Sequence, residues 1–177
     1  PANTFGIKGE RGAVEHQFVL AADQVGVDGR NAGGGDQLAH DFDALRQLPG
    51  RKFILTNAPL AYAERVIGAL GIGPLFDGVL SIEDMCMFGQ LRPKPDVRML
   101  RRVAVRLGVP PSRCVLVEDT LDHQKSARRI GMTTVWMQRW TRQAAKHVTP
   151  NAKVGVYLHR KPAYVCARIS SLQQLHK

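Results

Sequence analysis

The sequence lacks several features that would assign it to a particular class of protein. No apolar run approaches the ~20 residues that a membrane-spanning helix needs, so we expect no membrane contact. The chain does not open on a basic segment followed by an apolar one, so we expect no secretory signal. Its three cysteines, Cys86, Cys114 and Cys166, lie far apart, which argues against a disulfide framework or a zinc site and predicts a cytoplasmic location.

Aromatic residues are scarce, at 6% of the chain, whereas basic residues are abundant. The 25 Lys and Arg exceed the 15 Asp and Glu, and the net charge of +10 attracts anions such as phosphorylated small molecules or nucleic acid. The basic residues are dispersed and have no aromatic residues between them, unlike a face that binds single strands. We therefore rank a basic nucleic-acid-binding protein last among the possible functions.

The N-terminal part differs in composition from the rest. Its first 36 residues hold eight glycines, which disfavours helices, and 18–22 is its one apolar run. Gly33-Gly34-Gly35 is not a phosphate loop, because no strand precedes it and no Lys-Ser/Thr follows. We predict an atypical segment over residues 1–44 and a core domain over residues 45–177.

From residue 50 onward, short apolar runs alternate with stretches of helical periodicity. The stretches 59–70, 95–107 and 120–130 predict helices, and each is followed by glycine at 71, 108 or 131. The apolar runs predict five strands, at 52–55, 76–80, 114–117, 133–137 and 164–166. This alternation predicts an α/β fold with a parallel sheet and helices on both of its faces.

Three short segments carry polar groups of different kinds, and the first and third of them follow predicted strands. Thr56-Asn57 offers a hydroxyl and an amide, Lys94 is held between two prolines, and Glu118-Asp119 is a pair of carboxylates. Loops after parallel strands meet at one edge of the sheet, where open α/β folds bind ligands. A hydroxyl, an ammonium and two carboxylates together suit a phosphate beside Mg²⁺.

The order of these segments resembles the haloacid dehalogenase (HAD) superfamily, and within it the bacterial pyrimidine 5′-nucleotidase-like branch. The matching text runs from Leu48 to Trp136 and includes Phe-Ile-Leu-Thr56-Asn57, Arg-Pro-Lys94-Pro and Val-Glu118-Asp119-Thr. The resemblance implies a Rossmann-like three-layer sandwich with a mostly parallel sheet. It also implies a phosphoaspartyl mechanism, in which a strand-end aspartate attacks phosphorus and an acid two residues later protonates the leaving group.

Carried over by position, the resemblance gives each polar residue a role. Thr56 and Asn57 would bind the phosphate, Lys94 would bind it and stabilise the nucleophile, and Asp119 with Glu118 would hold Mg²⁺. Lys94 and Asp119 are the predicted catalytic residues. His123 stands where relatives often carry Asp or Asn, and a neutral imidazole is a poor Mg²⁺ ligand.

The nucleophile itself is not identified by the sequence. Asp41-Phe-Asp43 has suitable residues, but no buried strand precedes it and the next predicted strand follows too soon for a parallel crossover. Asp23 is better placed, because it follows the apolar run 18–22 and lies 33 residues before Thr56, but Val25 then stands in place of the general acid. We expect the first strand and the helical cap of this branch to be missing or atypical, with residues 1–44 a cap remnant or disordered.

The sequence thus predicts a phosphatase of nucleotidase type that hydrolyses a phosphorylated small molecule, a nucleoside monophosphate, with Mg²⁺. Whether this chain is catalytically active is left open, because the sequence does not identify its nucleophile. The alternative is a non-catalytic module of the same fold that binds phosphate or a nucleotide. The sequence does not predict an oligomeric state.

Overall fold

The computed structural model describes residues 17–21, 35–139, 142 and 160–176. Within them the chain forms one six-stranded sheet in the order β3-β2-β1-β6-β7-β8, and all five neighbouring pairs are parallel. The strands are β1 (Gln17–Ala21), β2 (Lys52–Leu55), β3 (Gly78–Leu80), β6 (Cys114–Glu118), β7 (Thr133–Met137) and β8 (Ala167–Ile169).

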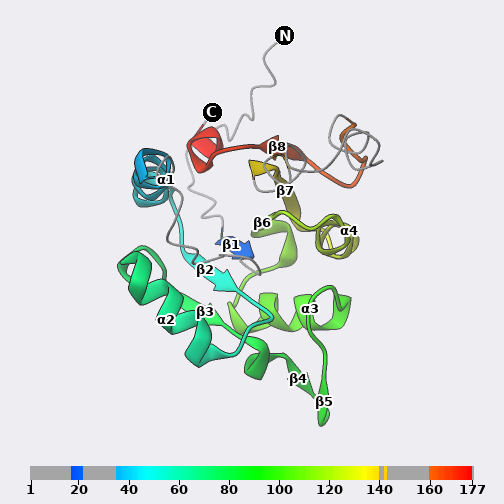
Figure 1. The fold of residues 1–177 in the computed structure, drawn as a ribbon. Helices are drawn as coiled ribbons and strands as arrows, with labels where there is room; N and C mark the ends of the chain where they lie inside the picture. Colours follow the sequence, from blue (N-terminus) through cyan, green and yellow to red (C-terminus); the bar gives the residue numbers. More distant parts are fainter. Residues whose placement is uncertain (1–16, 22–34, 140–141, 143–159, 177) are drawn as a thin grey trace, which may run out of the picture.

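Among the described residues, helices α1 and α2 cover one face of this sheet and α3 and α4 cover the other (Figure 1). The helices are α1 (Gly35–Gln47), α2 (Leu60–Leu70), α3 (Val97–Arg106) and α4 (Leu121–Arg129). Four short 3₁₀ turns are η1 (Gly73–Leu75), η2 (Ile82–Met85), η3 (Pro111–Arg113) and η4 (Leu172–His176). The predicted α/β architecture, a Rossmann-like sandwich with a parallel sheet, is confirmed. None of the described helices is long and apolar enough to cross a membrane.

The core lies in two layers because β6 is buried on both faces. Alternate residues of the strand point to opposite sides, so Cys114 and Leu116 pack in one cluster with α3 while Val115 and Val117 pack in the other with α1. All five residues of β6 are buried, which explains why this run is nearly continuous in apolar residues.

The N-terminal segment departs from its prediction. β1 is present and lies at the centre of the sheet, between β2 and β6, with Ala21 opposite Leu55 and Leu20 opposite Val117. Its few apolar residues are a weak local signal, and the strand is defined by pairing with segments far along the chain. The first strand is therefore not missing.

Helix α1 was also not expected, because glycines dominate the residues before it. Its apolar residues Ala44 and Leu45, with Leu48 just after it, are buried against β6, β7 and η4. The predicted boundary between residues 44 and 45 falls inside this helix, so the described residues before 45 share the core of the domain.

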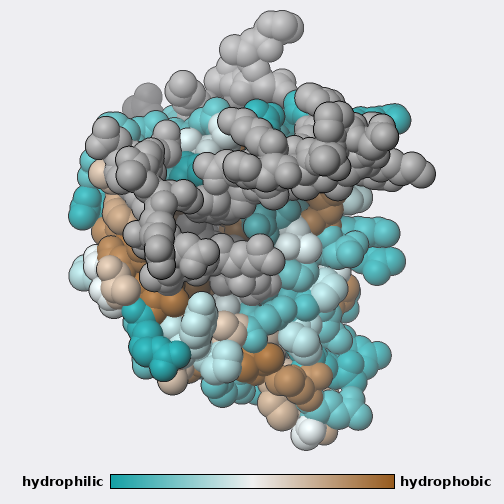
Figure 2. All heavy atoms as spheres, viewed as in Figure 1, coloured by the Kyte–Doolittle hydropathy of each residue, from teal (hydrophilic) through white to brown (hydrophobic). Residues whose placement is uncertain are grey.

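A small hairpin stands apart from the main sheet. β4 (Cys86–Met87) and β5 (Gln90–Leu91) pair antiparallel, and Phe88 and Gly89 form the turn between them. The hairpin projects from the lower end of the molecule, where hydrophobic atoms are visible on the surface among hydrophilic ones (Figures 1 and 2). Phe88 is 98% exposed there.

Candidate functional site

The predicted polar residues follow the carboxyl ends of strands β2 and β6. Thr56 comes directly after β2, and Glu118 is the last residue of β6. Because β1 pairs in parallel with both strands, all three run toward the same edge of the sheet. The sheet therefore brings the first and third predicted segments to one edge, as expected for a ligand site in an open α/β fold.

Asn57 connects this edge to the loop before α3. Its side-chain Nδ2 donates to the backbone oxygen of Lys94 at 3.2 Å, and its Oδ1 accepts from the Lys94 backbone nitrogen at 3.0 Å. Two reciprocal hydrogen bonds fix the backbone of Lys94 relative to the end of β2. The Lys94–Pro95 peptide bond in this loop is cis.

The Lys94 ammonium is buried inside the site. Nζ donates to the backbone oxygen of Leu55 at 3.0 Å and to Oε2 of Glu118 at 3.2 Å, and the side chains of Lys94 and Glu118 are both fully buried. A buried ion pair of this kind is retained only where hydrogen bonds satisfy its remaining groups. The structure thus joins the second and third predicted segments through a direct contact.

Glu118 accepts hydrogen bonds on both of its carboxylate oxygens. Oε1 accepts from the backbone nitrogens of Asp119 at 3.0 Å and Thr120 at 3.1 Å. Oε2 also lies 2.9 Å from Nδ1 of His123, a buried residue of α4. Burial alone would raise the pKa of the Glu118 carboxyl, but the His123 hydrogen bond and the Lys94 charge outweigh it and lower the pKa to about 2.

Asp119 has a different environment although it is the next residue. It is half-buried, and its Oδ1 accepts from the Thr120 hydroxyl at 3.1 Å, while its backbone oxygen accepts from Nε1 of Trp136 at 2.9 Å. Burial and the neighbouring Glu118 carboxylate raise the pKa of Asp119 to about 6. A carboxylate whose charge is this poorly compensated fits a cation.

Thr56 is 2% exposed. Its Oγ1 accepts from the backbone nitrogen of Ala58 at 3.0 Å, which leaves the hydroxyl hydrogen to donate. Its own backbone nitrogen donates to Leu80 of β3 at 2.9 Å. These bonds hold the hydroxyl at the strand end, as a phosphate-binding role requires.

Sequence reasoning missed Gln124 of α4, which fixes the end of β6. Gln124 is fully buried, and its Nε2 donates to the backbone oxygens of Glu118 and Val135, both at 2.7 Å. A glutamine inside an amphipathic helix is ordinarily assigned to the solvent face, so no local signal could have identified it. His123, noted in the sequence as a departure from the family, proves to be a partner of Glu118.

The two motifs considered for the nucleophile have different outcomes. Asp41 and Asp43 lie in α1, where Asp41 forms a buried ion pair with Arg139 at 2.5 Å and accepts from the backbone nitrogen of Leu172 at 2.8 Å. Asp41 thus helps to pack α1 against the C-terminal segment, on the face of the sheet opposite α3. Asp23 lies outside the described residues, two positions after β1 ends at Ala21.

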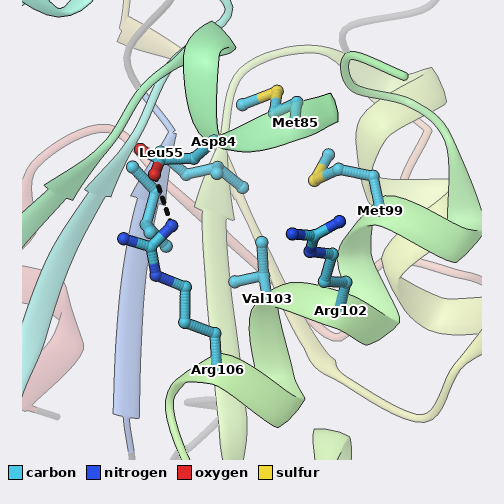
Figure 3. Close-up of a pocket in the computed structure, with 8 residues that line it drawn as sticks. Leu55, Asp84, Met85, Met99, Arg102, Val103 and Arg106 are labelled. Atoms are coloured by element: carbon cyan, nitrogen blue, oxygen red, sulfur yellow. Dashed lines mark hydrogen bonds and ion pairs between the residues drawn. The ribbon is translucent and has the colours of Figure 1, made fainter. Parts of the chain in front are cut away.

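Two further observations bear on ligands. Within the described ranges, no group of three or more His, Cys, Asp or Glu side chains could hold a metal ion, so Asp119 is at most part of a metal site there. A cavity of about 10 Å³ lies between β2, β3, η2 and α3, lined in part by Leu55, Met85 and Met99 and bordered by the Asp84–Arg106 ion pair (Figure 3). It has room for about one water molecule and is not the candidate site.

Family models match most of this chain. The model for haloacid dehalogenase-like hydrolases matches residues 15–131, a range that includes β1 as well as Thr56, Lys94 and Asp119. A second model, for HAD-hydrolase-like proteins, matches residues 91–172. The first of these covers well over half of the sequence.

Individual relatives agree with this result. Fructose-1-phosphate phosphatase YqaB of Escherichia coli is 32% identical over 95 residues, which is 52% of this chain and 48% of YqaB, so the chain spans about half of that relative. A haloacid dehalogenase-like protein of unknown function from Agrobacterium tumefaciens is 24% identical, with a TM-score of 0.56 over 81% of this chain and 57% of that one. YfnB of Bacillus subtilis, a HAD-hydrolase solved bound to magnesium, is 20% identical, with a TM-score of 0.56 over 80% and 54% of the two chains.

The structural relatives establish the fold alone, since they are under 25% identical, whereas the family model also matches the strands and loops that carry the polar residues. The pyrimidine 5′-nucleotidase-like branch is not distinguished by these relatives, one of which is a sugar phosphatase. On the sheet order, the clustered site and the family model, the chain belongs to the haloacid dehalogenase-like hydrolases.

Proposed function

We propose that this chain carries the catalytic core of a phosphatase that hydrolyses phosphomonoesters of small molecules with the help of Mg²⁺. The observation that supports this most directly is the buried Lys94 ammonium, which bonds Leu55 at the end of β2 and Glu118 at the end of β6. The likeness to a sugar phosphatase, YqaB, favours the same reaction. An ammonium held rigidly in a water-poor site stabilises charge on a transferring phosphoryl group.

The described residues bind the phosphate and the metal ion in different ways. The Thr56 hydroxyl donates to a phosphate oxygen, and Asn57 fixes the loop that carries Lys94. Asp119 would hold Mg²⁺, which fits its half-buried, poorly compensated carboxylate, and the magnesium-bound relative YfnB supports this choice of metal. When bound, the ion would neutralise negative charge on the phosphate.

Asp23 is our proposed nucleophile. Because β1 lies between β2 and β6, the chain leaves β1 at the same edge of the sheet as Thr56 and Asp119, and Asp23 is the first carboxylate after that strand. Its carboxylate would attack phosphorus and break the ester bond, giving an aspartyl phosphate and an alkoxide that takes a proton from water, because Val25 carries none to give. Water would then release phosphate and restore the aspartate.

The proposal is tested by phosphate release from a panel of nucleoside monophosphates and sugar phosphates, with Mg²⁺ and with EDTA. We expect Mg²⁺-dependent turnover that falls by about 10³-fold or more in Asp23→Asn and Asp119→Ala. Asp122→Asn, which removes an exposed carboxylate from the same helix as His123, is the matched control and should keep turnover. The preferred substrate class would decide between a nucleotidase, which the sequence resembles, and a sugar phosphatase.

Val25 predicts which phosphate esters the chain hydrolyses faster. A valine two residues after Asp23 cannot protonate an alkoxide, so esters with good leaving groups should be favoured. We expect p-nitrophenyl phosphate to be hydrolysed faster than alkyl phosphates, and Val25→Asp to raise turnover of alkyl phosphates by about 10²-fold or more. Equal rates for the two ester classes in the original chain would contradict this reading of Val25.

The same valine favours a second candidate function, a module that binds phosphate without hydrolysing it. In that case calorimetry would detect phosphate or nucleotide binding that weakens in Lys94→Met, while no phosphate is released from any substrate. Lys94→Met removes the charge and preserves most of the side-chain volume. Turnover that depends on Asp23 would rule this alternative out.

A further inference from the structure

The carboxylate of Glu118 has no capacity left for a metal ion. An ionised carboxylate offers about four lone-pair sites. In this structure four donors occupy them: the backbone nitrogens of Asp119 and Thr120 on Oε1, and Lys94 Nζ and His123 Nδ1 on Oε2. The Glu118 side chain is fully buried, so a cation could reach it only by displacing one of these donors.

The four donors are themselves fixed in place. The two backbone nitrogens belong to the residues that lead from β6 into α4, and the Lys94 backbone is held by Asn57. Lys94 Nζ also donates to Leu55 at the end of β2. Displacing Lys94 from Glu118 would leave a buried charge without its counter-ion, which is strongly unfavourable.

His123 supplies the remaining donor, and the chemistry of its partner defines its tautomer. A carboxylate only accepts hydrogen bonds, so Nδ1 of His123 must carry the proton that lies between it and Oε2. The side chains of His123 and Lys94 therefore both donate to a single oxygen, and each limits how far Glu118 can turn. An Asp or Asn at this position would be shorter, and an Asp would repel Glu118.

Asp119 is the contrasting member of the pair. It is half-buried, and among the described residues the Thr120 hydroxyl is the donor that bonds Oδ1 of its carboxylate. Within the described part of the chain, Asp119 therefore keeps lone pairs for a cation, whereas the four donors occupy those of Glu118. Mg²⁺ and Mn²⁺ both prefer such carboxylate oxygens to imidazole nitrogens, and Mg²⁺ is the stricter of the two ions in this preference.

We propose that Glu118 and His123 are positioning residues that hold the Lys94 ammonium, and that Asp119 alone of the carboxylate pair binds the divalent cation. The inference rests on the proposed function, since it concerns the same site, and it differs from the prediction that both carboxylates ligate Mg²⁺. It gives His123 a role in place of the metal-binding Asp or Asn expected there.

The first experiment measures binding of Mn²⁺, used as a paramagnetic probe, by electron paramagnetic resonance. The proteins compared are the original chain, Glu118→Gln, Asp119→Asn and the control Asp122→Asn. We expect Asp119→Asn to weaken Mn²⁺ binding by about tenfold or more relative to Glu118→Gln and to Asp122→Asn. Equal loss in Glu118→Gln and Asp119→Asn, or no Mn²⁺ binding by the original chain, would overturn the proposal.

The second experiment tests His123 without relying on Glu118→Gln, which removes a buried charge and can impair folding. Calorimetry measures inorganic phosphate binding in the presence of Mg²⁺ for His123→Ala and His123→Asn, with Ser126→Ala as the control for a buried polar residue of the same helix. His123→Ala should weaken phosphate binding by about tenfold, and His123→Asn, which keeps a donor, should recover part of the loss. Mn²⁺ affinity should stay unchanged in both variants.

A merely structural role for His123 would lower phosphate and Mn²⁺ affinity together, and that result would contradict the positioning role. The two proposals can also fail separately. A chain that releases no phosphate from any substrate, but whose Mn²⁺ affinity depends on Asp119 and not on Glu118, would contradict the proposed function while supporting this inference.

Discussion

Two aspartates of α1, separated by a single residue, have opposite environments. Asp41 is 4% exposed and pairs with Arg139, and its Oδ1 accepts from Ser171 Oγ and from the Leu172 backbone nitrogen. Asp43 pairs with Arg46 at 2.7 Å, but both side chains of that pair are about 60% exposed. The two identical side chains thus have different roles. Asp41 bonds α1 to the C-terminal segment, whereas Asp43 is exposed to solvent.

This contrast gives a direct test of what burial does to an ion pair. Asp41→Ala should lower the free energy of unfolding by about 3–5 kcal/mol, because it leaves the Arg139 guanidinium buried without its carboxylate. Asp43→Ala, the matched control, should change it by less than about 1 kcal/mol. Urea unfolding of both variants measures the difference, and similar losses would show that the Asp41 network is not important for stability.

Glu118 predicts a pH dependence of stability. Its folded pKa of about 2 lies below the unfolded value of 4.5, so its contribution is fully present above about pH 4.5 and is lost as pH falls toward 2. The loss should reach about 2 kcal/mol by pH 3. Urea unfolding of the original chain and of Glu118→Gln from pH 7 to pH 3 measures it, and the gap between the two proteins should narrow with falling pH. A constant gap would contradict the lowered pKa.

At the scale of elements, the hairpin β4–β5 carries an unfavourable turn residue. Phe88 has φ of +52° and Gly89 has φ of +73°, so both turn residues occupy the left-handed region. Glycine adopts this conformation readily and asparagine tolerates it, whereas a bulky side chain does so at a cost. Phe88 is also 98% exposed, so no buried contact offsets that cost.

We therefore expect Phe88→Asn to stabilise the protein by about 0.5–1 kcal/mol, seen as a higher melting temperature. Leu91→Asn on β5 is the control, because Leu91 is also exposed but does not occupy the turn. A stabilisation of equal size in both variants would indicate a gain from removing exposed apolar surface rather than from the backbone conformation.

The elements also show where prediction from sequence works. β2 and β7 match their predicted ranges, and β6 is one residue longer, because each is a buried apolar run bounded by turn residues. β8 begins after the predicted range, since Tyr164 lies outside the strand, where its backbone oxygen accepts from Thr134 Oγ1. β1 and α1 were not predicted as core elements because the glycines around them weaken every local signal, and their positions depend on contacts with β2, β6 and η4.

The candidate site was predictable to a similar extent. Thr56, Asn57, Glu118 and Asp119 could be selected because each follows a strand that the sequence reveals, and Lys94 could be selected because it lies between two prolines. The different roles proposed for Glu118 and Asp119 could not be predicted from the sequence. They depend on which of the two neighbouring carboxylates points inward to Lys94 and His123.

At the scale of the whole molecule, the sheet buries one thiol at its centre. Cys114 begins β6 and is 0% exposed, and burial raises the pKa of its thiol to about 11. Cys86, by contrast, is exposed on the hairpin. All three cysteines are free.

Cys114 should therefore report global unfolding. In Cys86→Ser/Cys166→Ser, the remaining thiol should react with a disulfide reagent about 10³-fold or more slowly than Cys86 does in Cys114→Ser/Cys166→Ser. When Asp41→Ala is added to the first of these variants, the labelling rate of Cys114 should rise. The increase should equal the increase in the unfolded fraction that urea unfolding of Asp41→Ala gives. Fast labelling of Cys114 under native conditions would show that β6 is exposed by local opening.

The central place of β1 has a consequence for the order of events during synthesis. Its partner β6 begins at Cys114, almost one hundred residues after Gln17, so β1 leaves the ribosome long before its second neighbour exists. At ~5–20 residues per second this interval is roughly 5–20 s. For that time an apolar segment destined for the middle of a sheet has an unpaired edge, and nascent chains of this protein should be substrates for chaperones that shield the N-terminal region until translation has passed β6.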